Sequence, residues 1–205
     1  KFTAAQIERF KTLDKASLAF EVMRPYVGGT IDDATLKIIC AETINFDFPL
    51  VPITDTISSL ELFHGPTLAF KDVGARFMSR CLGYFSKQAR AENATANDHK
   101  SQEDKTQGEK PNTVLVATSG DTGGAVANGF LGVTGVNVII LYPKGKVSPI
   151  QELQLTTLGQ NITALEVDGS FDDCQAIVKE AFMDGELNAA YNLTSANSIN
   201  VARWL

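Results

Sequence analysis

The chain has 205 residues, 44% of them hydrophobic and 20% charged, which is typical of a globular protein with a substantial core. Its formal net charge of -6 argues against nucleic acid or an anionic membrane as a partner, although a small anion can still bind at a local site. Cys40, Cys81 and Cys174 have neither metal-binding spacing nor the pattern of a disulfide framework, which favours a cytoplasmic protein without a metal site. No apolar run approaches the roughly 20 residues of a membrane span, and we recognise no signal peptide.

The N-terminal residues predict three helices. Thr3 and Gln6 have the spacing of a capping box in front of the first helix. A second helix over 17–23 is expected to end near Pro25, because a proline disfavours helical geometry in the residue before it. A third helix is expected to begin near Thr30. We interpret these helices as packing or interface elements without chemistry of their own.

A regular alternation of strands and helices begins at Thr113. The apolar runs at 113–117, 136–141, 162–167 and 190–193 predict strands, and helical patterns lie between them at 123–131, 149–158 and 171–182. Such alternation predicts an α/β fold with a parallel sheet and flanking helices. Ligands of these sheets bind in the loops that follow the carboxyl ends of the strands.

These patterns divide the chain into four parts. Residues 1–55 form a helical N-terminal region, residues 56–87 start the main domain, and residues 113–205 form its α/β three-layer part. The segment 88–112 between them contains almost no large apolar residue, so burial cannot offset the entropy lost on ordering, and we expect a mobile surface insertion. A regulatory binding loop is the alternative for this segment.

The first of three chemically suggestive loops leads to Lys71. A predicted strand at 57–63 is followed by the turn His64-Gly65-Pro66 and by a helix that starts near Phe70. Apolar neighbours and the positive end of the helix dipole both disfavour a charged Lys71, and a neutral amine is what a Schiff-base lysine requires. Taken alone, Lys71 is better interpreted as an exposed lysine at a helix N-terminus, because lysine side chains are mostly exposed.

The second loop spans 117–125 and reads ATSGDTGGA. It follows a strand and opens a helix, so its N–H groups and hydroxyls can converge on an anion, and its glycines allow a close approach of the backbone. It matches neither the Walker loop nor GxGxxG. An ordinary tight turn between a strand and a helix remains open on this pattern.

The third loop spans 194–203 and again follows a predicted strand. We expect Asn197 to cap a helix, with Ser198 in its first turn and Arg203 more than one turn later. A serine, amides and an arginine together can bind a phosphate. A simple helix cap with a solvent-facing arginine is the alternative.

The segments LELFHGPTLAFKD, ATSGDTGGAVANGF, ILYPKGKVSPIQ and LTSANSIN occur in this order and resemble the threonine synthase family. HGPTLAFKD followed by TSGDTGG is a highly specific combination. The resemblance covers nearly the whole chain outside the polar segment. It implies the tryptophan-synthase-β-like fold (fold type II), two α/β domains, and pyridoxal 5'-phosphate as the cofactor between them.

The resemblance also implies roles for individual residues. Lys71 would hold the cofactor as a Schiff base and later transfer protons as the catalytic base. The cofactor-binding residues would be Lys71, Ser119, Gly120, Asp121, Thr122 and Gly123, with the turn 119–122 also binding the substrate carboxylate. The residues for the substrate phosphate would be Thr122, Asn197, Ser198 and Arg203. Relatives of this fold carry asparagine at the position of Asp121, beside the phenolic oxygen of the cofactor, and an aspartate there would need a shared proton.

The implied reaction converts O-phospho-L-homoserine and water to L-threonine and phosphate, in a monomer or homodimer. A phospho-lyase that forms a keto acid, another β-replacing or dehydratase enzyme of this fold, and a non-catalytic binding or assembly module are the alternatives. The family's Ser-Gly-Asn-Phe-Gly loop, which holds the cofactor phosphate, does not occur before Leu205. The resemblance therefore implies a fragment trimmed at both ends, incomplete at its C-terminus and inactive alone.

Overall fold

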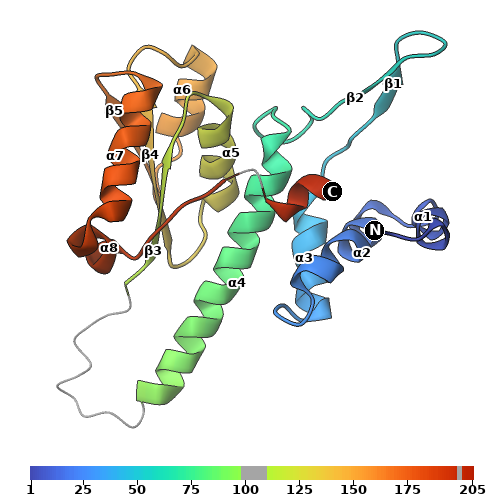
Figure 1. The fold of residues 1–205 in the computed structure, drawn as a ribbon, viewed down its shortest axis with the longest axis horizontal. Helices are drawn as coiled ribbons and strands as arrows, with labels where there is room; N and C mark the ends of the chain where they lie inside the picture. Colours follow the sequence, from blue (N-terminus) through green and yellow to red (C-terminus); the bar gives the residue numbers. More distant parts are fainter. Residues whose placement is uncertain (98–109, 198–199) are drawn as a thin grey trace.

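A four-stranded parallel sheet forms one half of the molecule (Figure 1). The computed structural model describes residues 1–97, 110–197 and 200–205. The strands are β3 (Asn112–Ala117), β4 (Val136–Pro143), β5 (Ile162–Val167) and β6 (Leu193–Thr194), in the order β5-β4-β3-β6. The β3–β4, β4–β5 and β3–β6 pairs are all parallel, as the alternation of strands and helices predicts.

Helices cover both faces of this sheet. The connecting helices are α5 (Asp121–Phe130), α6 (Pro149–Thr156), α7 (Phe171–Met183) and α8 (Gly185–Tyr191). Val114 and Val138 point into a core that also contains residues of α5 and α6, whereas Leu115 and Leu141 pack with Cys174 of α7 on the opposite face. This alternation follows from the two-residue period of a strand. The sheet is thus the middle of three layers.

The N-terminal helices form a second core. They are α1 (Ala4–Phe10), α2 (Lys15–Val27) and α3 (Asp33–Thr43), and buried residues of α2 and α3 pack against α4 (Lys71–Asn97). Between α3 and α4 lies a two-stranded antiparallel hairpin of β1 (Leu50–Pro52) and β2 (Ser58–Leu60) that projects from the body (Figure 1). The short 3-10 helix η2 (Val201–Trp204) returns to α2 and α4.

Helix α4 joins the two cores because it packs on both sides. Val73 and Phe77 face the N-terminal core, and Ala75 faces the core beneath the sheet. A Cβ atom at Gly129 of α5 would lie 3.1 Å from the carbonyl of Ala75, so this glycine allows the two helices to approach closely. The position of the first turn of α4 is therefore fixed from two directions.

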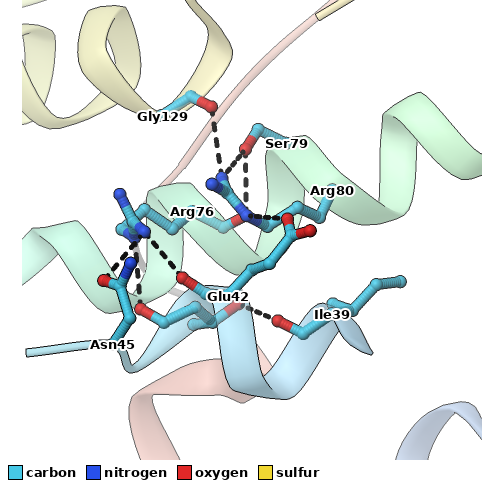
Figure 2. Close-up of polar contacts among 8 residues, drawn as sticks. Ile39, Glu42, Asn45, Arg76, Ser79, Arg80 and Gly129 are labelled. Atoms are coloured by element: carbon cyan, nitrogen blue, oxygen red, sulfur yellow. Dashed lines mark hydrogen bonds and ion pairs between the residues drawn. The ribbon is translucent and has the colours of Figure 1, made fainter. Parts of the chain in front are cut away.

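Two arginines of α4 tie it to its neighbours (Figure 2). Arg76 donates to the carbonyl oxygens of Glu42 (2.6 Å) and Thr43 (3.2 Å) at the end of α3. Arg80 donates to the Glu42 carboxylate (3.1 Å) and to the carbonyl of Gly129 in α5 (3.5 Å). The last carbonyls of a helix have no intrahelical donor, and a cation there also suits the helix dipole. Burial lowers the pKa of Arg76.

Most expected elements are present, and three of the differences in their bounds have a clear physical cause. Helix α2 continues through Pro25 to Val27, because a proline this close to the end removes few hydrogen bonds and the N–H of Gly28 still reaches the carbonyl of Arg24. Asp32 rather than Thr30 caps α3, since its side chain accepts from the N–H of Thr35. The strand expected at 190–193 is wrong in position, because α8 occupies its first residues and β6 starts at Leu193.

The polar segment 88–112 lies only partly within the described residues. Residues 88–97 continue helix α4, and Asn112 begins β3. The division of the chain at residue 88, like the other domain limits, stays a prediction. Within the described ranges, no helix is both long and apolar enough to cross a membrane.

Replacing Arg76 by methionine tests the junction between α3 and α4. The variant keeps the apolar stem but removes the donors to two helix-end carbonyls, so we expect the free energy of unfolding to fall by about 2 kcal/mol. The matched control is Arg9→Met, which removes an ion pair with Glu21 at a side chain that is 58% exposed, and which should change stability by less than about 0.5 kcal/mol. Urea unfolding followed by circular dichroism measures both, and equal losses would contradict this account of Arg76.

Candidate functional site

Lys71 is the first residue of helix α4. Its side chain is 24% exposed, and its amine lies 5.8 Å from the ring centre of Phe70. The preceding turn is held by hydrogen bonds from the N–H of Leu68 to the carbonyl of Gly65 and from the N–H of Asp72 to the carbonyl of Ala69. The amine is thus partly desolvated and rests on a rigid element, as a reactive lysine requires.

A buried aspartate fixes the loop in front of Lys71. Asp72 is only 1% exposed. One carboxylate oxygen accepts from the N–H of Thr67 at 2.9 Å, and the other accepts from the Thr67 hydroxyl. A Cβ atom at Gly65 would lie 2.4 Å from this carboxylate, so only glycine fits there. This contact explains the pairing of Gly-Pro-Thr with Lys-Asp in the sequence, since the aspartate next to the reactive lysine anchors the turn before it.

The second loop is organised by Thr118. This buried residue follows strand β3, and its hydroxyl oxygen accepts from the N–H groups of Gly120 (3.1 Å) and Gly123 (2.8 Å). Both glycines therefore shape the loop, and their N–H groups are already occupied. The N–H groups of Asp121 and Thr122, the first two residues of α5, have no intrahelical acceptor and remain suited to an anion.

The two loops meet at Lys71 and Asp121. The Lys71 amine lies 3.9 Å from Oδ2 of Asp121, whose side chain is 50% exposed. The other carboxylate oxygen, Oδ1, accepts from the side-chain amide of Gln151 at 2.7 Å. The structure therefore brings together the lysine and the glycine-rich loop that the sequence singled out separately.

The third loop runs along the first turns of α4. Asn200 donates from its side chain to the carbonyl of Gly74, three residues after Lys71, at 2.9 Å. The cap expected at Asn197 is wrong, because Asn200 caps η2 through its bond with the N–H of Ala202. Asn197 itself is exposed, and its carbonyl accepts from Asn200.

The remaining members of the predicted phosphate group cannot be assigned contacts. Ser198 lies outside the described residues, and so does the side chain of Arg203, which belongs to η2. Thr122 is half-buried in the first turn of α5, beside Asp121. Their grouping around a substrate phosphate stays a prediction.

A separate cavity of about 930 Å³ lies on the other side of the start of α4. Its walls come from α2, the hairpin and the C-terminal residues, and they include Leu18, Phe48, Phe70 and Leu205. Lys71 and the residues of the glycine-rich loop do not line it. The loops around Lys71, and not this cavity, therefore form the candidate site.

The residues at the loops fit a cofactor that carries an aldehyde and an anionic group. A partly desolvated amine can condense with the aldehyde. Next to it, a strand-to-helix loop offers two N–H groups at the positive end of a ten-residue helix. Among the described residues, no cluster of three or more histidine, cysteine or acidic side chains could hold a metal ion.

Comparison with known proteins identifies the family of this chain and a cofactor of this kind. The family described as "Pyridoxal-phosphate dependent enzyme" matches residues 59–205. The chain is 42% identical to the threonine synthase of Serratia marcescens over 205 residues, which cover 100% of this chain and 43% of that relative. The crystal structure of threonine synthase from Escherichia coli aligns with a TM-score of 0.80 at 42% identity, covering 99% of this chain and 42% of that one. The pyridoxal-phosphate-bound threonine synthase from Brucella melitensis aligns with a TM-score of 0.82 at 37% identity, covering 99% and 41%.

Fold and comparisons together define an α/β enzyme that uses pyridoxal phosphate, of the tryptophan-synthase-β-like fold type II. The chain belongs to the pyridoxal-phosphate dependent enzyme family, and the relatives that it matches over its whole length are threonine synthases. It spans less than half the length of these relatives, 43% in two of them.

Three contributors to the site were not identified from the sequence. Thr118 stands inside the quoted loop, and a threonine that precedes Ser-Gly at the end of a buried strand is a usable signal for its role. Thr67 also lies within a quoted motif. Gln151 has no such signal, because nothing in the sequence indicates that it reaches Asp121, 30 residues earlier.

Thr118→Val tests the organisation of the glycine-rich loop. The substitution preserves the shape of the side chain but removes the acceptor of the buried Gly120 N–H and one of the two acceptors of the Gly123 N–H, so we expect a loss of about 2 kcal/mol in the free energy of unfolding. The control is Thr156→Val in α6, where an exposed hydroxyl donates to the Glu152 carbonyl and its loss should cost less than about 0.5 kcal/mol. Urea unfolding compares the two, and a Thr118 variant as stable as the Thr156 variant would refute the role of this hydroxyl.

Proposed function

We propose that this chain is the lysine-bearing part of a threonine synthase, which converts O-phospho-L-homoserine and water to L-threonine and phosphate in the last step of threonine biosynthesis. The observation that carries the proposal is the partly desolvated Lys71 amine, 3.9 Å from the loop of the TSGDTGG motif. Whole-chain similarity to threonine synthases supports the choice of reaction.

Lys71 has two tasks in this proposal. Its amine attaches pyridoxal phosphate, which when bound supplies an electron sink that makes the protons next to the substrate amino group acidic. With the substrate in place, the same amine would move protons at Cα and Cβ of the substrate. Loss of the γ-phosphate, protonation of the γ-carbon, addition of water at Cβ and return of the α-proton would complete the conversion. The start of α4 suits this work, because its turn is fixed by the Asp72–Thr67 contact.

The glycine-rich loop binds the carboxylate of the substrate in this proposal. Ser119 contributes an exposed hydroxyl, and Asp121 and Thr122 contribute N–H groups at the helix N-terminus. Gly120 and Gly123 allow the backbone to approach the cofactor. Asp121 occupies the position beside the cofactor at which relatives of this fold carry asparagine.

A second group of residues receives the phosphate of the substrate. Thr122, Asn197, Ser198 and Arg203 are proposed for this role, since hydroxyls, amides and a guanidinium are the donors that phosphate prefers. The bond from Asn200 to the Gly74 carbonyl supports the proposal, because it holds the third loop beside the first turns of α4.

We further propose a cytoplasmic enzyme that works as a monomer or homodimer. All three cysteines are free thiols. Burial raises the pKa of Cys40 to about 11 and that of Cys81 to about 12, and it also raises the pKa of Cys174. Free cysteines without a disulfide framework suit a reducing compartment.

Lys71→Ala should remove the activity. In the holoenzyme of which this chain is the lysine-bearing part, we expect turnover of O-phospho-L-homoserine to fall by more than about 10⁴-fold, the upper end of what a positioned general base contributes. Lys87→Ala, on an exposed turn of the same helix, is the control and should retain wild-type turnover. Threonine and phosphate are quantified together, and release of phosphate with a keto acid in place of threonine would identify a phospho-lyase instead.

Borohydride reduction of the wild type, followed by peptide mapping, should place the cofactor label on Lys71.

Arg203→Ala should weaken binding of the phosphorylated substrate. Loss of a charge-assisted hydrogen bond predicts that KM rises roughly ten-fold or more, with a smaller effect on kcat. Steady-state kinetics with O-phospho-L-homoserine measures both constants. An unchanged KM would exclude Arg203 from the phosphate site.

A further inference from the structure

We infer that Gln151 is a positioning residue, which holds the Asp121 carboxylate in place opposite Lys71. The inference concerns the site of the proposed function and assigns a second task to a residue that otherwise only caps helix α6. Hydrogen bonds fix each end of the Gln151 amide, and the backbone at Gly120 leaves room for it.

The amide of Gln151 has one possible orientation. Its oxygen accepts from the backbone N–H of Ser148 (3.2 Å) and from the Ser148 hydroxyl (2.9 Å) in the capping box of α6. Only an acceptor can face a backbone N–H, so the oxygen must point toward Ser148. The nitrogen therefore points away from the cap, and it donates to Oδ1 of Asp121 at 2.7 Å.

This bond determines what Asp121 presents to the lysine. With Oδ1 occupied by the amide, Oδ2 is the oxygen that faces the Lys71 amine, at 3.9 Å. The Asp121 side chain is 50% exposed, so packing alone does not hold it. Gln151 thus supplies the restraint that burial does not.

The glycine-rich loop leaves space for this contact. Gly120 has φ +153, and a Cβ atom added there would lie 2.5 Å from the amide nitrogen of Gln151. A side chain at this position would displace the amide from Asp121. The missing side chain at Gly120 therefore leaves room for the hydrogen bond between Gln151 and Asp121, in addition to allowing the turn itself.

Helix α6 is thereby coupled to both loops of the site. Its Gln154 donates to the carbonyl of Thr67 in the turn before Lys71, at 3.4 Å, while Gln151 reaches Asp121 one turn earlier. The two glutamines lie on neighbouring turns of one helix and contact the two loops that flank the amine.

Gln151→Met compared with Ser148→Ala separates positioning from capping. Both variants weaken the capping box, but only Gln151→Met removes the donor to Asp121. In the cofactor-free protein, the Asp121 carboxylate held 3.9 Å from the Lys71 amine forms an ion pair with it, and this pair must separate before the amine can attack an acylating reagent. We therefore expect Gln151→Met to raise the rate of Lys71 acetylation by acetic anhydride about five-fold relative to Lys87 in the same sample, as read by mass spectrometry. Ser148→Ala should leave this ratio unchanged.

Asp121→Asn completes a double-mutant cycle. If Gln151 acts through Asp121, Asp121→Asn should raise the Lys71 acetylation ratio by a similar factor, and the double variant should be no faster than either single variant. A wild-type ratio in Gln151→Met, an equal rise in Ser148→Ala, or independent multiplication of the two effects would each overturn the inference.

A second measurement uses the holoenzyme. Gln151→Met should lower kcat about ten-fold with a smaller change in KM, whereas Ser148→Ala should keep both constants near wild type. If the wild-type holoenzyme forms no threonine, the proposed reaction fails, and the acetylation ratios of the cofactor-free protein still decide whether Gln151 positions Asp121.

Discussion

The two-sided packing of helix α4 is the constraint on which the site depends. One face of the helix closes the N-terminal core through Val73 and Phe77, and the other lies against α5, where Ala75 meets Gly129. Arg76 and Arg80 add hydrogen bonds toward the same neighbours (Figure 2). A helix held on both sides cannot tilt or slide without breaking one of the two cores. Its first residue, Lys71, therefore has a defined position relative to the strand ends of the sheet.

The charges and helix dipoles around Lys71 suit this position to a chemical role. The amine is surrounded by the helix N-termini of α4 and α5, which favour anionic ligands, and by one carboxylate, Asp121, which faces it. The other nearby carboxylate, Asp72, is buried and fully engaged by Thr67. These two acidic residues thus have different roles, because Asp72 holds a loop and Asp121 faces the reactive amine.

Local signals in the sequence predicted most of the fold. The capping box of Thr3 and Gln6 depends on contacts three residues apart, and it occurs as expected. The errors arose where tertiary contacts determine the secondary structure. At 190–193, apolar residues that could form a strand instead end helix α8. The same contrast between local patterns and tertiary contacts applies to the site. The lysine and the glycine-rich loop stand out as motifs, but the Gln151–Asp121 bond joins residues of different helices and has no local pattern.

The buried thiols have a practical consequence for experiments on this protein. Cys40 and Cys174 are fully enclosed, and Cys81 is partly covered within the N-terminal core. Because maleimides and iodoacetamides attack thiolates, these side chains should be poor targets for such reagents near neutral pH. A single cysteine engineered on the exposed hairpin would then be the preferred attachment point for a fluorophore or spin label. Distances across the molecule could be followed without first removing the native cysteines.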